Sequence, residues 1–110
     1  MIIGETLQTS GSPYLSDWFP RQGDSMLAAT EVLIVANDGV LFVGVQTKNQ
    51  EDPDSAASVL SSTSYTTEGT YTLGVAACKE LVRYVFIVSD GAGTDGRVHF
   101  RMLPAIWFHN

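Results

Sequence analysis

The glycine-rich segment Gly91–Gly96 has the residue spacing most suggestive of chemistry. It matches the G-x-G-x-x-G pattern of dinucleotide-binding loops, but such a loop must lead from a strand into a helix whose N-terminus holds the pyrophosphate. The next segment, Arg97–Met102, alternates polar and apolar side chains and therefore predicts a strand. We interpret Gly91–Gly96 as a loop between strands and expect no cofactor.

Two acidic loops offer carboxylates. Asp90 and Asp95 flank the glycines, and Glu51, Asp52 and Asp54 form a second group. Ca²⁺ prefers such oxygen ligands, but neither group has the spacing of an EF-hand. We expect solvated loops and no metal site, with Ca²⁺ binding as the alternative.

Catalysis by acyl transfer would need a nucleophile, a base and an orienting group. The sequence has no G-x-S-x-G motif, and its two histidines, His99 and His109, belong to no zinc-ligand pattern. A hydrolase or isomerase would require a pocket that joins His99 to a carboxylate. We predict no catalytic residues and no enzyme activity.

Basic and aromatic side chains are the remaining candidates for a site. Arg97, His99 and Arg101 alternate outward along one predicted strand, and Arg83 interrupts the apolar run Leu81–Ser89. If these strands form a hairpin, the four basic residues share a face. Because clustered like charges repel one another, an acidic residue of the same chain or a partner must neutralise them. Glu31 or Glu80 of the same chain is one candidate, and an interface with another subunit or a particle is the other.

The aromatic residues Trp18, Phe19, Trp107 and Phe108 stand out in the sequence. Trp18 and Trp107 are expected to pack in the core or at its rim, and Phe19 to pack with Trp18 onto the sheet. Exposed together, the tryptophans would form a sugar-stacking platform or a protein interface. We predict an interface made of these contact residues: Trp18, Phe19, Arg83, Arg97, Arg101 and Trp107.

The segment Ala29–Asn49 is the clearest structural element. Two β-branched runs flank Asn37-Asp38-Gly39, which predicts a hairpin because these residues accept the positive φ of tight turns. A two-residue Asp38-Gly39 turn pairs Asn37 with Val40 and sets Glu31 opposite Gln46. This register places Val32 and Ile34 on the same face as Val43 and Val45. It leaves an opposite face, with Leu33, Val35 and Phe42, that another element or subunit must cover.

The remaining pattern predicts a single all-β domain over residues 1–110. Leu81–Ser89 is expected to be a central strand, and Arg97–Met102 points Val98, Phe100 and Met102 inward until Leu103-Pro104 ends or bends it. No amphipathic helix and no βαβ alternation is visible. We predict an antiparallel β-sandwich of about six to eight strands, jelly-roll or immunoglobulin-like. Residues 1–8 are expected to form a short edge strand or an arm, and residues 1–13 together are a candidate flexible N-terminal arm.

The composition limits the kinds of partner that the protein is expected to bind. Charged residues make up 16% of the chain, against a usual value of about 25%. The net charge of −6 argues against nucleic acid, which requires clustered Lys and Arg. The single cysteine, Cys78, excludes an intrachain disulfide and is expected to be buried. We see no signal peptide and no apolar run of membrane-spanning length, so we expect synthesis in a cytoplasm and no membrane partner.

Four segments together resemble small accessory structural proteins of tailed bacteriophages, the decoration, cement and tail-associated β-domains. They are WFPRQGD (18–24), TKNQED (47–52), KELVRY (79–84) and VHFRMLP (98–104). The resemblance implies a virion protein, made in the host cytoplasm, that binds capsid or tail proteins and copies of itself as a homo-oligomer. It carries over no catalytic residue. The alternative function is a small carbohydrate-binding β-sandwich module that uses exposed aromatic residues.

Overall fold

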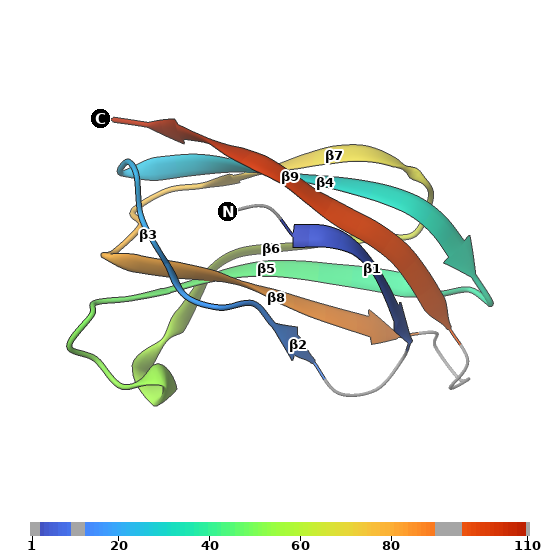
Figure 1. Cartoon of the computed structure of the whole chain (residues 1–110), viewed down its shortest axis with the longest axis horizontal. Coiled ribbons are helices and arrows are strands. Elements are labelled where there is room, and N and C mark those ends of the chain that lie inside the picture. Colours follow the sequence, from blue (N-terminus) through green and yellow to red (C-terminus); the bar gives the residue numbers. More distant parts are fainter. Residues whose placement is uncertain (1–2, 10–12, 90–95, 110) are drawn as a thin grey trace.

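The protein is built from two antiparallel sheets packed face to face, as the sequence predicts. The structure, a computed structural model, describes residues 3–9, 13–89 and 96–109. Sheet A has the strand order β1-β9-β4-β7, and sheet B has the order β2-β8-β5-β6, with β3 also paired to β8 (Figure 1). The bounds of the elements are β1 Ile3–Thr9, β2 Tyr14–Leu15, β3 Phe19–Pro20, β4 Ser25–Ala36, β5 Val40–Lys48, the 3-10 turn η1 Asp54–Ala56, β6 Ser58–Tyr65, β7 Gly69–Val75, β8 Leu81–Ser89 and β9 Arg97–Phe108.

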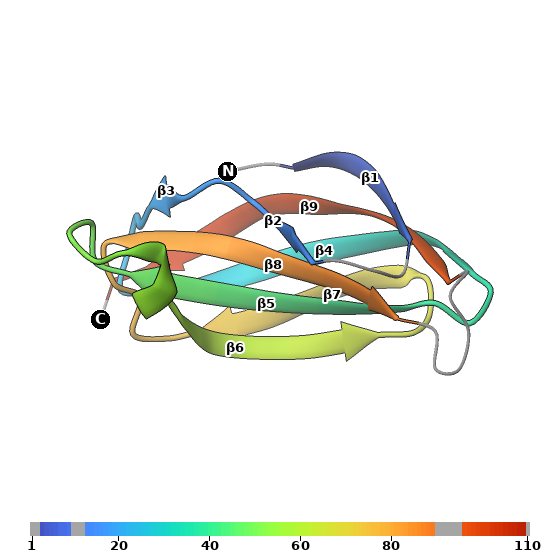
Figure 2. The ribbon, with the colours of Figure 1, turned by 90° about the horizontal axis from the view of Figure 1, so that it is seen from below.

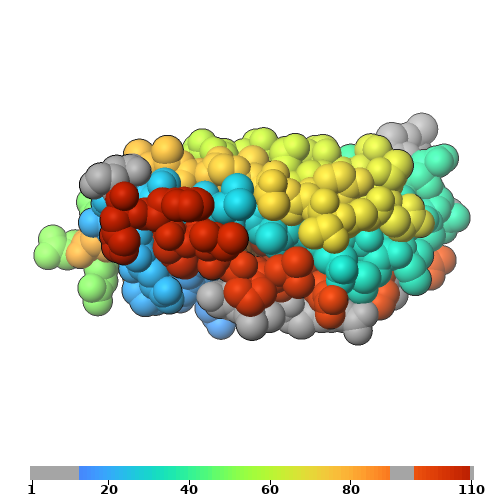
Figure 3. Space-filling model, turned by 90° about the horizontal axis from the view of Figure 1, so that it is seen from above, coloured from blue at the N-terminus to red at the C-terminus, as the bar shows by residue number. Residues whose placement is uncertain are grey.

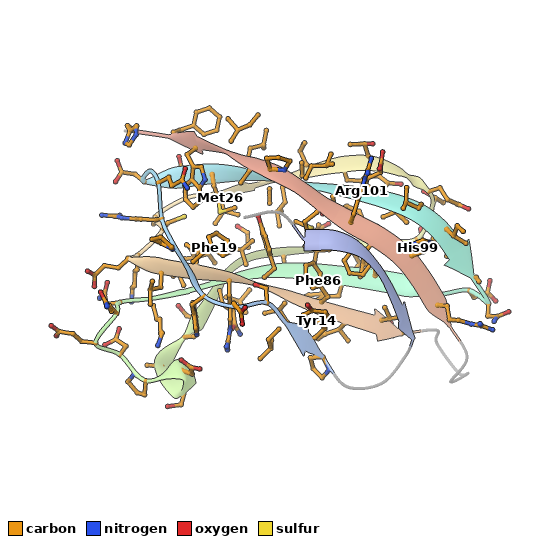
Figure 4. All side chains as sticks on the ribbon, viewed as in Figure 1. Tyr14, Phe19, Met26, Phe86, His99 and Arg101 are labelled. Carbon is orange, nitrogen blue, oxygen red and sulfur yellow. The ribbon has the colours of Figure 1, made fainter. Side chains whose placement is uncertain are left out.

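The core lies between the sheets and is made by alternating side chains of the long strands. Sheet A supplies Val98, Phe100 and Met102 from β9, as predicted, and sheet B supplies Tyr84 and Phe86 from β8. The rings of Phe86 and Phe100 meet across the interface with their centroids 4.9 Å apart. Figure 4 shows Phe19 and Phe86 pointing into the space between the layers. Burial of apolar surface on this scale is the main favourable term in folding.

The predicted hairpin of Ala29–Asn49 is wrong. The turn itself is present: Asn37 and Asp38 have φ of 56° and 58°, and the Gly39 N–H donates to the Ala36 carbonyl over 3.1 Å. Its central residues are therefore Asn37 and Asp38. The two strands then diverge, because β4 pairs with β7 and β9 in sheet A while β5 pairs with β6 and β8 in sheet B. The turn is a corner between the two sheets (Figure 1).

This separation changes the predicted register. Glu31 lies opposite Arg101 and Thr70, and Gln46 lies opposite Arg83. An irregularity in β4 between Val32 and Ile34 changes the alternation there, so that Val32 is buried and Ile34 is 54% exposed. Such a bulge moves the following side chain to the other face of the sheet.

The predicted second face, with Leu33, Val35 and Phe42, therefore does not exist as one surface. Val35 packs against the core. Phe42 belongs to sheet B, where its ring lies 3.1 Å from the position of a Cβ at Gly44. No separate element is therefore needed to cover these residues as a group, because Val35 packs on the core and Phe42 lies against Gly44 of its own strand.

The two ends of the chain add strands to sheet A. β1 pairs with β9, so Ile3–Thr9 is an edge strand, while residues 10–12 lie outside the described part. β9 continues through Pro104 to Phe108 with a register irregularity. The sequence left open whether Leu103-Pro104 ends or bends the strand, and the strand bends. Cys78 is buried, as predicted, and burial raises the pKa of its thiol.

The corner at Ala36–Gly39 gives a test of the fold. A Cβ at Gly39 would lie 2.8 Å from the Arg97 carbonyl oxygen, a backbone atom that cannot move alone, whereas a Cβ at Gly74 in β7 would meet nothing within 4 Å. We expect Gly39→Ala to lower the free energy of unfolding by about 1–3 kcal/mol, as overpacking does. We expect Gly74→Ala to change it by less than about 0.5 kcal/mol. Urea denaturation measures both, and equal effects would contradict the close approach.

Tyr84 gives a second test, because its buried hydroxyl has no hydrogen-bond partner among the described residues. An unpaired buried polar group costs about 1–3 kcal/mol. We therefore expect Tyr84→Phe to be at least as stable as the wild type at neutral pH in urea denaturation. A loss above about 1 kcal/mol would reveal a partner for the hydroxyl.

Tyr84→Phe also tests how the stability of the protein depends on pH. Burial raises the pKa of Tyr84 from 10.0 to about 12. Because the folded-state pKa lies above the unfolded-state value, ionisation of this phenol disfavours the folded state: stability is unaffected by it below pH 10 and falls as the pH rises towards 12. The full shift corresponds to about 3 kcal/mol. Tyr84→Phe should lose less stability than the wild type over this range, since the other tyrosines remain in both.

Candidate interaction surfaces

The outer face of sheet A carries three zones along β4 and β9. In the central zone, Arg101 of β9 lies opposite Glu31 of β4, and its Nε donates to the Glu31 carboxylate. The pairing of Arg101 with Glu31 was one of the predicted answers to the basic stripe, and it is confirmed. Figure 4 shows Arg101 and His99 along β9. An exposed pair of this kind contributes about 0.2–1 kcal/mol.

The second zone is a shallow pocket next to the chain corner. Its volume is about 220 Å³, and it is lined by Ile34, Ala36, Arg97 and His99. The bulge in β4 contributes to this pocket by turning Ile34 outward. The lining combines the apolar side chains of Ile34 and Ala36 with the basic side chains of Arg97 and His99.

The third zone, the apolar end, lies where β9 passes the start of β4. Ile106 is 56% exposed and Phe108 is 47% exposed, and β4 sets Leu27 and Ser25 opposite them. Figure 3 shows this face, with the end of β9 (red) lying over the start of β4 (blue to cyan). Trp107, between the two exposed residues in sequence, instead packs against the core and meets Phe19 edge to face.

The outer face of sheet B carries a different arrangement, which we call the Trp18 cluster: Trp18, Gln46, Lys48, Asp54 and Arg83. Alternation brings Gln46 and Lys48 of β5 and Arg83 of β8 to this face, with Gln46 directly opposite Arg83. Trp18 comes from the segment between β2 and β3, which the backbone and hydroxyl of Ser16 anchor to Tyr84. Trp18 and Phe19 are neighbours in a strand-like segment, so one ring lies outside the sheet and the other inside.

In the Trp18 cluster, two cationic side chains lie against the indole ring. The Arg83 guanidinium carbon lies 4.4 Å, and the Lys48 Nζ 5.0 Å, from the centroid of the Trp18 ring. Both distances are in the range of cation–π attraction. The Trp18 Nε1 donates to the Asp54 carboxylate over 3.1 Å. The Trp18 side chain thus links η1 to sheet B.

The two cations of this cluster share one carboxylate, that of Asp54. The Lys48 side chain, 9% exposed, donates to the Asp54 carboxylate over 2.8 Å and to the Asp52 carbonyl over 2.9 Å. The Arg83 Nε donates to the Gln46 side-chain oxygen over 2.7 Å. The Lys48 hydrogen bond holds the pKa of Asp54 below its usual value, with Trp18 and Arg83 acting in the same direction and partial desolvation opposing them. The carboxylate therefore stays ionised to lower pH.

The predicted contact residues do not form one surface: they lie on two different sheets and partly in the core. The predicted common face of Arg83 with Arg97, His99 and Arg101 is wrong, because β8 and β9 lie in different sheets and turn these residues to opposite outer faces. Phe19 is buried, with its ring near Tyr84 and Trp107. The two tryptophans do not form a common platform, since Trp18 lies on the outside of sheet B and Trp107 packs on the core.

Sequence reasoning missed the parts of these surfaces that depend on pairing. Gln46 and Lys48 were not predicted as contact residues, although the alternation of β5 already places them on one face. Asp54 was considered only as one of the acidic loop residues. Ile106 was not a candidate, and its exposure follows the register irregularity of β9 near Pro104. Asp90 and Asp95 lie outside the described residues. Across the described part of the chain, no three His, Cys, Asp or Glu side chains gather closely enough to hold a metal ion.

No protein-family model matches the chain, and no curated protein matches it. Among the described residues, no helix has the length and apolar character to cross a membrane. We therefore infer the function from the chain's own residues and surfaces.

The Trp18 cluster yields a prediction about stability. We expect Trp18→Ala to lower the free energy of unfolding by about 2–3 kcal/mol, since it removes two cation–π contacts and a hydrogen bond. Trp18→Phe keeps the ring but loses the Nε1 donor, so we expect a loss of about 1 kcal/mol. Urea denaturation followed by circular dichroism measures both. Losses below about 0.5 kcal/mol for both variants would show that the ring does not fasten η1.

Proposed function

We propose that this chain is a non-enzymatic structural protein of a bacteriophage particle, which binds and stabilises a capsid or tail lattice. The observation that carries the proposal is the apolar end of sheet A. Ile106 and Phe108 are about half exposed at the end of the longest strand pair. Apolar side chains grouped on an outer face are typical of protein contact sites. Together with the resemblance of the four segments, this surface favours attachment to another protein.

The distribution of charge supports an assembly role over catalysis. The charged side chains at the centre of both faces bond to neighbours of opposite sign, Arg101 to Glu31 and Lys48 to Asp54. They position strands and loops.

The carbohydrate-binding alternative is less well supported. It needs aromatic rings that present their faces together to solvent. Trp18 is half-buried on its cations, and Trp107 faces the core. A single half-exposed indole gives less contact area than the paired rings on which this alternative depends.

The proposal predicts binding to particles through the apolar end. In sedimentation of purified particles with added protein, we expect the wild type to move with the particles. Ile106→Asp should weaken this binding at least about tenfold, because it sets a charge in the contact. The matched control is Thr66→Asp, which adds the same charge at an exposed position between β6 and β7 and should bind like the wild type.

Two results would overturn the proposal. One is wild-type protein that stays free in the presence of particles from its own source and is absent from those particles by mass spectrometry. The other is selective binding on a glycan array that Trp18→Ala abolishes, which would favour the carbohydrate-binding alternative. Unchanged particle binding by Ile106→Asp would place the contact elsewhere and remove the observation on which the proposal stands.

A further inference from the structure

One lateral edge of the sandwich is almost without charge. β6 and β7 are the edge strands of sheet B and sheet A, and they lie along the same side of the molecule (Figure 2). From Ser55 to Cys78 the only charged residue is Glu68, and the segment contains no proline. In a chain with a net charge of −6, this edge is a neutral strip.

Such an edge is unusual because an open strand presents unpaired N–H and C=O groups to solvent. Proteins normally protect it with charged side chains, prolines, bulges or very short strands. The opposite side of sheet B follows this rule: β2 and β3 have two residues each, and β3 contains Pro20. β6 is eight residues long and has neither a charge nor a proline.

The protection that β6 does have covers only its first half. The register with β5 shifts between Ser61 and Val59, which leaves Leu60 as an extra residue. The segment Ser61–Tyr65 then pairs with β5 without interruption. In an antiparallel ladder, every second residue of such a segment turns its N–H and C=O away from the partner strand. These groups are placed to accept another strand.

We propose that a second copy of this chain occupies the edge, with β6 pairing antiparallel to β6 across a two-fold axis. Sheet B then continues through both copies. Charge is the first argument for a second copy. Two chains that each carry −6 repel one another least where neither presents a charge. A basic partner would find no counter-charge on this strip.

The second argument is self-complementarity. A two-fold contact sets the same residues against one another. The outward side chains of the regular segment, Ser62 and Ser64, are exposed and lie opposite Gly44 and Phe42 of β5. Small hydroxyl side chains can face one another across an antiparallel pair and form hydrogen bonds. The inward side chain of Tyr65 is already buried against Tyr71, so pairing requires no rearrangement of the core.

The contact predicts a dimer whose formation depends on protein concentration. In sedimentation equilibrium of the purified chain, we expect the wild type to pass from monomer to dimer as concentration rises. Ser62→Lys should weaken the dimer at least about tenfold, since it brings a charge from each copy to the shared edge. The matched control is Thr72→Lys, at an exposed position of the neighbouring edge strand β7, and it should dimerise like the wild type. Circular dichroism confirms that both variants fold.

A mixture of two variants tests the two-fold arrangement directly. Ser62→Lys and Ser62→Glu should each be monomeric alone and should associate when mixed, because their charges then attract across the axis. A wild type that stays monomeric at every concentration overturns the proposal. So does a dimer that Thr72→Lys weakens as much as Ser62→Lys. Either result leaves the particle-binding proposal intact, since that depends on Ile106 at the far end of sheet A.

Discussion

The corner at Ala36–Gly39 is the constraint on which the rest of the structure depends. It directs two adjacent β-branched strands into opposite sheets, so β4 and β5 never pair. The turn contains the hydrogen bond from the Gly39 N–H to the Ala36 carbonyl and two residues at positive φ, and Gly39 lets the backbone of Arg97 approach closely. Because of this corner, each long strand finds partners that are distant in sequence. The arrangement of both outer faces follows from those distant partners.

The partition of the polar residues is the first consequence. With β4 beside β9, Glu31 meets Arg101; with β5 beside β8, Gln46 meets Arg83 and Lys48 approaches the Trp18 ring. On each outer face, a basic side chain at the centre is thus bound to an acidic one, Arg101 to Glu31 and Lys48 to Asp54.

Local patterns in the sequence predict what is local in the fold. The alternation in Arg97–Met102 correctly places Val98, Phe100 and Met102 inward, and the apolar run correctly gives the bounds of β8. The presence of a positive-φ turn is also correct, but its central residues are Asn37 and Asp38 and not the predicted Asp38 and Gly39. Strand partners could not be predicted, because the same turn chemistry suits a hairpin and a corner. The bulge before Ile34 could not be predicted either, since it arises from how β4 matches β9 and leaves no mark in its own residues.

The candidate surfaces show the same division. Alternation correctly predicts that Arg101 faces outward, and charge left Glu31, Glu80 or an outside partner as its possible contacts; the structure pairs it with Glu31. Its grouping with Arg83 failed, since that required knowing which strands share a sheet.

The edge that we propose as a self-association site can be recognised only once the strand order is known. The stretch Ser55–Cys78, with Glu68 as its one charged residue, is plain in the sequence, but a strand without charge at the centre of a sheet is ordinary. It becomes a candidate contact surface because β6 and β7 lie at the sheet edges. The apolar end likewise depends on the bend at Pro104, which sends Ile106 outward while Trp107 still reaches the core. The two surfaces lie on different elements, the outer face of sheet A and the edge of sheet B. One chain can therefore use both at once, and a chain that does so can bind a lattice while it joins its neighbour.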